Sequence, residues 1–429
     1  MRTKLILDVL NTGKVKQQLL LWSQQFDNVV WLDSNQYDRS HTRYDAILAV
    51  DEFTSIRTSK INPFHKLNKF QRITKDWIFG YITYDIKNDI ELLKSENRDE
   101  LGFDELFFFQ PKKLFLLKGN KLEIQYLKFF EKDVERDLET IQRLNVTNEA
   151  RVNKLTIASR IKKETYLKKV GTVLDHIHTG DIYEANFCQE FFAEKATINP
   201  VKTYNKLNAI SKPPFATFLK DGSNYLLSAS PERYIYKQGE IVTSQPIKGT
   251  AKRSQDAKED ARLISQLEND DKERSENIMI VDLVRNDLSK TAIKGSVQVK
   301  ELCKVYTFKQ AHQMISTIQS KVDKALPPVE IIKTTFPMGS MTGAPKISAM
   351  KIIEKLEETK RGLYSGCVGY FTPEDNFDFN VVIRSILYNS NNRYVSFSVG
   401  SAITSKSVPL NEYEECMIKA KAMLEVLEN

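Results

Sequence analysis

The second half of the chain alternates between two hydrophobic patterns, one typical of helices and one of strands. Residues 162–178 predict an amphipathic helix that ends at Thr179-Gly180, where glycine takes a left-handed conformation easily. Further helices are predicted over 255–288, from about 345, and from about Pro409 to the C-terminus. Short β-branched and aromatic runs predict strands over 215–219, 225–228, 234–237, 241–244, 366–371, 381–388 and 394–399. Because the strands cluster, we expect a mostly antiparallel α+β fold.

The first third is also mixed in character. Residues 77–84 predict a strand, and 107–109 with 114–117 predict buried strand segments around a turn at Pro111. Residues 131–154 are charged and helix-prone and contain neither proline nor glycine. We therefore expect a mixed α/β region over 1–130, a helical link over 131–154 and a second domain over 155–429.

The bulk composition excludes several classes of protein. The 429 residues are 41% hydrophobic and 28% charged, as in ordinary globular proteins. No run reaches the roughly 20 apolar residues of a membrane helix, and the N-terminus lacks a signal peptide, so we expect a cytoplasmic protein with no membrane. The 63 basic and 56 acidic residues are interspersed, which disfavours nucleic-acid binding. Four scattered cysteines predict structural thiols, not a disulfide framework.

Two predicted helices carry pairs of glutamates three residues apart. Glu273 and Glu276 lie on one face of the first helix, and Glu412 and Glu415 repeat this spacing on the last one. Four carboxylates from two helices suit an oxygen-only magnesium site. Such pairs are more often solvated surface residues, so this spacing alone leaves both interpretations open.

An ordered series of segments decides between them: GDIYEAN at 180–186, SPE at 230–232, PIKGT at 246–250, ENIMIVDLVRND at 276–287, MGSMTGAPK at 338–346, GCVGY at 366–370, VIRS at 382–385 and SVP at 407–409. This series resembles the chorismate-utilising enzymes, a family with anthranilate, aminodeoxychorismate, isochorismate and salicylate synthase branches. The resemblance runs from about residue 160 to the C-terminus. Residues 77–85 and 101–111 look like the N-terminal part of the first two branches.

The resemblance implies a fold, a metal and a substrate. The fold is α+β, with two large antiparallel sheets packed face to face and helices outside. Mg2+ is expected on Glu276 and Glu415, with Glu273 and Glu412 reached through water, and it would bind the ring carboxylate of chorismate.

The resemblance also implies a set of substrate-binding residues. Arg384 and Lys419 match counter-charges for the substrate carboxylates, and arginine suits this role because its planar fork meets a carboxylate bidentately. Without the resemblance, Arg384 would be interpreted as a structural ion pair and Tyr364 as a core aromatic. The matching substrate-binding positions are Thr250, Ser340, Tyr364, Arg384, Gly400, Ser401, Ala402 and Lys419.

Lys248 separates the amine-using branches, because the anthranilate branch typically has alanine there and the aminodeoxychorismate branch has lysine. The resemblance implies that the Lys248 amine attacks ring carbon 2 as the 4-hydroxyl leaves, and that ammonia then adds at carbon 4. We expect desolvation or nearby positive charge to lower the lysine pKa. Glu232 matches the acid that protonates the hydroxyl and needs a raised pKa. His312 matches the histidine of pyruvate elimination and is expected here to position the substrate.

Glu184 departs from the family pattern. The isochorismate and salicylate branches have a lysine base there, and the amine-using branches usually have glutamine. Glu184 thus argues against water as the nucleophile, and a carboxylate can hold ammonium. The four cysteines lack the glycine-flanked turn of amidotransferases, so a separate glutamine amidotransferase subunit is expected to supply ammonia. The alternatives are an anthranilate synthase component and a non-catalytic chorismate- or tryptophan-binding protein.

Overall fold

A computed structural model describes residues 1–37, 43–58, 61–91, 93–145 and 154–429, and its named strands all pair antiparallel. The first sheet has the order β1-β6-β5-β3-β2-β9-β10-β19-β20-β8, with the short strands β7 and β16 paired to β8. Its strands are β1 (Arg2–Asp8), β2 (Asn28–Asp33), β3 (Ala46–Thr58), β5 (Leu106–Lys118), β6 (Lys121–Leu127), β7 (Ala158–Ser159), β8 (Glu184–Ala193), β9 (Phe215–Asp221), β10 (Asn224–Ser230), β16 (Gly343–Ala344), β19 (Ser385–Asn389) and β20 (Tyr394–Thr404).

The second sheet continues from the first through the long strand β5. Residues 106–109 of β5 pair with β4, whereas residues 113–118 pair with β6 of the first sheet. From β4 the order is β17-β18-β11-β12-β15, with β13 and β14 also paired to β15. These strands are β4 (Ile78–Ile82), β11 (Arg233–Gln238), β12 (Ile241–Gln245), β13 (Ile247–Lys252), β14 (Gln298–Thr307), β15 (Ala311–Lys321), β17 (Cys367–Phe371) and β18 (Phe377–Val381).

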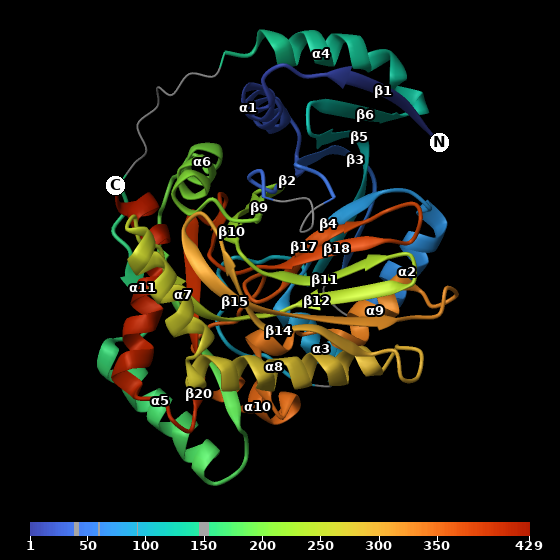
Figure 1. Cartoon of the computed structure of the whole chain (residues 1–429). Coiled ribbons are helices and arrows are strands. Elements are labelled where there is room, and N and C mark those ends of the chain that lie inside the picture. Colours follow the sequence, from blue (N-terminus) through green and yellow to red (C-terminus); the bar gives the residue numbers. More distant parts are fainter. Residues whose placement is uncertain (38–42, 59–60, 92, 146–153) are drawn as a thin grey trace.

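Helices cover the outside of this pair of sheets (Figure 1). They are α1 (Thr12–Trp22), α2 (Pro63–Thr74), α3 (Lys87–Ile90), α4 (Val134–Arg143), α5 (Lys163–His178), α6 (Pro200–Ser211), α7 (Ala257–Glu268), α8 (Asp271–Ser289), α9 (Pro328–Thr335), α10 (Lys346–Leu356) and α11 (Pro409–Glu428). Side-chain alternation explains the layers: Val30 of β2 joins the core that includes α2, α8 and α9, whereas Val29 and Trp31 join the core under α5, α6 and α11. The expected α+β fold of two antiparallel sheets is confirmed.

Two predicted boundaries are wrong for local reasons. The helix predicted over 255–288 is two helices, because the Asp270 side chain accepts the backbone N–H groups of Lys272 and Glu273 and starts α8 afresh. Pro111 makes no turn but lies within β5, opposite a register irregularity of β3 between Glu52 and Thr54. A bulge tolerates a residue that has no N–H to donate.

The strand predicted over 381–388 is also interrupted. β18 ends at Val381, β19 begins at Ser385, and Arg384 between them has a φ of 53°. This left-handed conformation is unusual for a non-glycine residue and marks Arg384 as structurally constrained.

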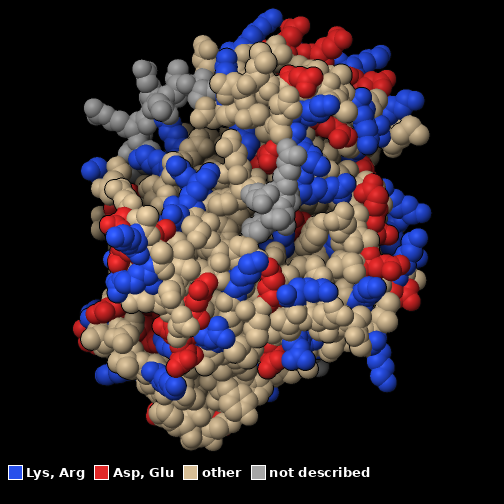
Figure 2. Space-filling view, in the orientation of Figure 1, with Lys and Arg blue, Asp and Glu red and all other residues tan. Residues whose placement is uncertain are grey.

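The predicted regions share the same sheets, since β2 pairs with β9 and β4 with β17. The proposed boundaries therefore stay predictions, and residues 146–153 of the link lie outside the described residues. Within the described chain, no helix has the length and apolar character needed to cross a membrane. Figure 2 shows basic and acidic side chains interspersed over the displayed face.

Candidate active site

Lys248 of β13 lies in the interior beside strand β8. Its Nζ is 2.9 Å from Oε1 of Glu184, and the two side chains are only 12% and 1% exposed. Desolvation alone would lower the pKa of Lys248, but Glu184, Glu276 and Glu415 together raise it above its ordinary value. The expected lowering of the Lys248 pKa is thus not what the structure shows. The amine holds its proton, and Glu184 is the acceptor within reach.

Glutamates of α8 form one wall of the site. Burial raises the pKa of Glu276 to about 7 against the opposing effect of Lys248 and Lys272. Its Oε1 is buried and accepts no hydrogen bond from the described residues. Burial and the neighbouring Glu415 also raise the pKa of Glu273. A buried carboxylate oxygen that accepts no hydrogen bond suits a cation as its ligand.

Glutamates of α11 form the opposite wall. Glu412 is 1% exposed and accepts a short hydrogen bond from Ser401 of β20. Burial opposes ionisation of Glu415, but Lys419, with Nζ at 2.6 Å, lowers its pKa overall. Lys419 also donates to the Gly400 carbonyl at 2.8 Å.

The two walls converge on one lysine side chain. Nζ of Lys272 lies 3.8 Å from Oε1 of Glu276 and 3.5 Å from Oε1 of Glu412, so one ammonium group bridges α8 and α11. Carboxylate oxygens are the donors that Mg2+ prefers, and this donor set suits the ion in type. Across the residues that the structure describes, no three acidic, histidine or cysteine side chains form a closed ligand set.

Glu232 is placed to carry a proton. It is 5% exposed, and burial raises its pKa to about 7 although Ser340, Lys248 and Lys419 oppose the shift. The raised pKa expected for a general acid is present. A small cavity lies beside Glu232 and Ser340, lined also by Val284 and Met338.

Arg384 is a partly buried arginine without a carboxylate partner in the described chain. Its Nη1 donates to the Lys419 carbonyl at 3.3 Å, and it makes no ion pair with any residue in the described ranges. Burial lowers its pKa, while Tyr364 and Glu415 oppose the shift. A partly buried guanidinium that lacks an ion pair suits an anionic ligand. Tyr364 is also buried, with its hydroxyl 3.5 Å from the Cys188 sulfur.

The segment 400–402 lies in β20 where the strand leaves β19. The ladder with β19 ends at Ser396, whereas Gly400 and Ala402 still pair with Cys188 and Asn186 of β8. A Cβ at Gly400 would lie 2.4 Å from the Cys188 sulfur, so this approach requires glycine. Ala402 is extended, so no glycine-specific conformation is needed there.

Two predicted site residues make no hydrogen bond or ion pair with this cluster in the described chain. Thr250 is exposed on β13, and its hydroxyl makes no hydrogen bond with the described residues. His312 is fully buried, with Nε2 2.9 Å from Asp260 of α7 and Nδ1 3.0 Å from the Thr307 hydroxyl of β14. Both ring nitrogens are engaged there, and the roles of the two residues stay predictions.

Three contacts went unseen in the sequence. Lys272, four residues before Glu276, has a helical spacing that signals an ion pair. The partnerships of Lys248 with Glu184 and of His312 with Asp260 join residues 64 and 52 positions apart, and no local pattern reveals them.

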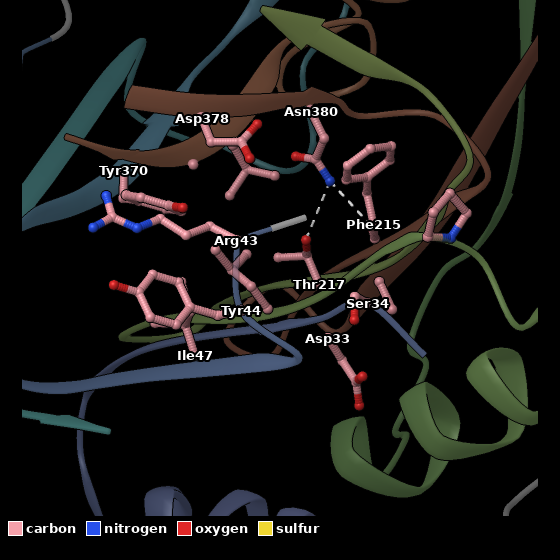
Figure 3. Close-up of a pocket in the computed structure, with 15 residues that line it drawn as sticks. Asp33, Ser34, Arg43, Tyr44, Ile47, Phe215, Thr217, Tyr370, Asp378 and Asn380 are labelled. Atoms are coloured by element: carbon pink, nitrogen blue, oxygen red, sulfur yellow. Dashed lines mark hydrogen bonds between the residues drawn. The ribbon is translucent and has the colours of Figure 1, made fainter. Parts of the chain in front are cut away.

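A second cavity lies between the two sheets, away from these residues (Figure 3). Asp33 and Thr217 come from the first sheet, and Tyr370, Asp378 and Asn380 from the second. The Asn380 amide donates to the Phe215 carbonyl at 3.0 Å and faces Thr217. None of the predicted site residues lines it.

Comparison with known proteins agrees with this geometry. A family model for chorismate binding enzymes matches residues 24–425. A probable chloroplastic aminodeoxychorismate synthase of Oryza sativa subsp. japonica is 39% identical over 280 residues, covering 65% of this chain and 31% of the relative. Anthranilate synthase component 1 of Thermus thermophilus is 32% identical over 359 residues, covering 82% of this chain and 77% of the relative.

A solved structure also matches this chain closely in fold. The crystal structure of anthranilate synthase component I from Streptococcus pneumoniae matches with a TM-score of 0.78 and 26% identity, covering 88% of this chain and 91% of that one. The chain belongs to the chorismate binding enzyme family. Relatives named for both amine-using branches match it, and it spans less than a third of the rice relative.

Proposed function

We propose that this chain is the large subunit of an aminodeoxychorismate synthase, which converts chorismate and ammonia to 4-amino-4-deoxychorismate for para-aminobenzoate and folate synthesis. The observation that carries the proposal is the buried Lys248 amine, placed between Glu184 and the glutamates of α8 and α11. A surface lysine would have no access to a bound ligand.

Three residues, Lys248, Glu184 and Glu232, carry out the first step, in which the 4-hydroxyl is displaced. Lys248 passes a proton to Glu184 and its nitrogen bonds to ring carbon 2. The ring double bonds shift, the bond from carbon 4 to the hydroxyl oxygen breaks, and Glu232 gives its proton so that water leaves. Because its pKa is about 7, Glu232 holds that proton in a useful fraction of molecules at neutral pH.

Binding of the substrate rests on opposite charges. Arg384 and Lys419 attract the carboxylates of chorismate, and Tyr364 and Ser340 line the same region. Glu276 and Glu415 would hold Mg2+, with Glu273 and Glu412 acting through water, and the bound ion supplies positive charge to the ring carboxylate. His312 supports β15 against α7 in this scheme.

Ammonia comes from a separate glutamine amidotransferase subunit in this proposal. All four cysteines are buried, and burial raises the pKa of the Cys188 thiol to about 12 and of Cys416 to about 11. Burial raises the pKa of Cys303 and Cys367 as well. A glutamine-hydrolysing thiol needs the opposite shift.

The experiment incubates the purified chain with chorismate, Mg2+ and ammonium chloride and identifies the product by chromatography and mass spectrometry. Aminodeoxychorismate supports the proposal. Anthranilate with pyruvate would identify the second candidate, an anthranilate synthase component, which the Thermus thermophilus relative favours. Consumption of glutamine by the chain alone would contradict the separate subunit.

A further inference from the structure

Glu184 has one oxygen that its surroundings leave without a donor. Its backbone is fixed by pairing with Thr404 of β20 and Ala344 of β16. Oε1 accepts the Lys248 ammonium at 2.9 Å, whereas Oε2 is equally buried and accepts no hydrogen bond from the described residues. With 1% of the residue exposed, such an oxygen is costly unless a ligand donates to it.

We infer that Glu184 is the ammonium-binding residue of this chain, an inference that rests on the proposed function. Glu184 accepts the proton that ammonium loses before the resulting ammonia reacts. The charged groups that face it are Lys248 from β13 and Glu276 from α8, while β16 and β20 contribute backbone. A carboxylate binds a cation far better than it binds neutral ammonia. Because the Glu184 carboxylate also contacts Lys248, it interacts with both amines of the reaction, the lysine and the ammonium ion.

The protons balance through Glu184. After the first step, Glu184 passes the Lys248 proton by way of water to Glu232, which gave its own to the departing hydroxyl. Ammonium then gives Glu184 one proton, and ammonia bonds to carbon 4 as the ring double bonds shift back. The electron pair of the breaking bond at carbon 2 leaves with the Lys248 nitrogen. Lys248 takes the proton from Glu184, and every group returns to its starting state.

The test is the variant Glu184→Gln, which keeps the side-chain length and an acceptor for Lys248 but removes the charge. We expect the KM for ammonium to rise by about tenfold or more, because a charge-assisted bond is lost. The KM for chorismate stays nearly unchanged. The rate of the wild-type protein follows the ammonium concentration as pH varies, whereas that of the variant follows free ammonia. Glu190→Gln, on the same strand but bonded to Arg160 and Tyr394, leaves the KM for ammonium unchanged.

A second measurement keeps the two proposals apart. Ammonium chloride is titrated calorimetrically into wild-type protein, Glu184→Gln and Glu184→Asp, each held with Mg2+ but without chorismate, so that no turnover contributes heat. Saturable heat in the wild-type and Glu184→Asp proteins, but not in Glu184→Gln, supports the inference. Equal heat, or an equal KM for ammonium, in wild-type protein and Glu184→Gln would overturn it, even if aminodeoxychorismate forms. If ammonium binds through Glu184 but no aminodeoxychorismate forms, only the proposed function fails.

Discussion

Strand β8 contributes to two buried charged clusters that differ in how completely the chain satisfies them. In the first, which we call the Arg361 cluster, Arg361 donates to both oxygens of Glu357, at 2.7 and 2.9 Å, and to the backbone carbonyls of Met341 and Asn186. Glu357 also accepts the Cys188 N–H at 2.9 Å. Every strong charge there has a partner, as a structural cluster requires.

The site around Lys248 is more open than the Arg361 cluster, with the Glu415 side chain 44% exposed, and it is incomplete. Arg384 has no ion pair in the described chain, and one oxygen each of Glu184 and Glu276 lacks a donor. The chain thus leaves hydrogen-bonding capacity of charged groups of both signs unused within one region. The unsatisfied groups, and not the burial of charge as such, therefore mark the site that takes a ligand.

The largest expected effect concerns Lys248. In Lys248→Ala the rate of aminodeoxychorismate formation falls by at least about a thousandfold, because the covalent nucleophile is lost. Initial rates measured without added amines check this. Lys237→Ala, which removes a buried lysine bonded to the Asp375 carbonyl, keeps the wild-type rate. A Lys248→Ala rate close to that of Lys237→Ala would end the covalent scheme.

The next effect separates the two clusters by stability. Arg361→Met lowers the free energy of unfolding by about 3–5 kcal/mol, because a buried carboxylate loses its partner. Arg384→Met changes that free energy little, since no carboxylate partner loses its counter-charge, yet it weakens chorismate binding. Denaturant unfolding and KM values for both variants measure the contrast. Equal destabilisation by Arg361→Met and Arg384→Met would show that both arginines stabilise the fold to the same extent.

The pKa of about 7 at Glu232 predicts two pH effects. Because the folded-state pKa lies above the ordinary value, the folded protein retains this proton while the unfolded chain has lost it. The free energy of unfolding therefore falls between about pH 4.5 and pH 7, by up to about 3 kcal/mol. The kcat/KM for chorismate falls about tenfold per pH unit above pH 7 as the acid ionises.

The variant Glu232→Gln isolates these effects. Its unfolding free energy loses this part of the pH dependence, and the remaining activity lacks the limb that falls above pH 7. Chemical denaturation across pH and a pH–rate profile are the measurements. A wild-type profile in Glu232→Gln would assign the proton to another group.

The smallest effect concerns the support of Glu412. Ser401→Ala removes the hydroxyl that donates to this carboxylate and costs about 1 kcal/mol, equivalent to about fivefold weaker apparent affinity for Mg2+. Activity titrated with MgCl2 measures it. Ser398→Ala on the same strand serves as the control. An unchanged Mg2+ dependence in Ser401→Ala would separate Glu412 from the metal.

Local patterns predicted much of the fold. Helix α5 and strands β9 to β12 follow the predicted periodicity within a few residues, since amphipathic spacing and β-branched runs are local signals. The break at Asp270 and the passage of Pro111 through β5 were missed. Each depends on a specific capping bond or on an irregularity of the partner strand, which a hydrophobic pattern does not contain.

The site was predictable in its parts but not in its connections. The glutamate pairs of α8 and α11 follow from helical spacing, and the resemblance assigned Lys248, Glu232 and Arg384. The raised pKa of Lys248 was missed, because it depends on how closely Glu184, Glu276 and Glu415 approach in three dimensions. Charge balance in a buried site is a property of tertiary packing.

The most direct test of the central claim is mass spectrometry of the denatured protein after incubation with chorismate and Mg2+ in the absence of ammonium. We predict a peptide containing Lys248 whose mass is increased by the mass of chorismate minus that of one water molecule. No such peptide is expected in Lys248→Ala. An unmodified Lys248 in protein that goes on to form aminodeoxychorismate once ammonium is added would contradict it.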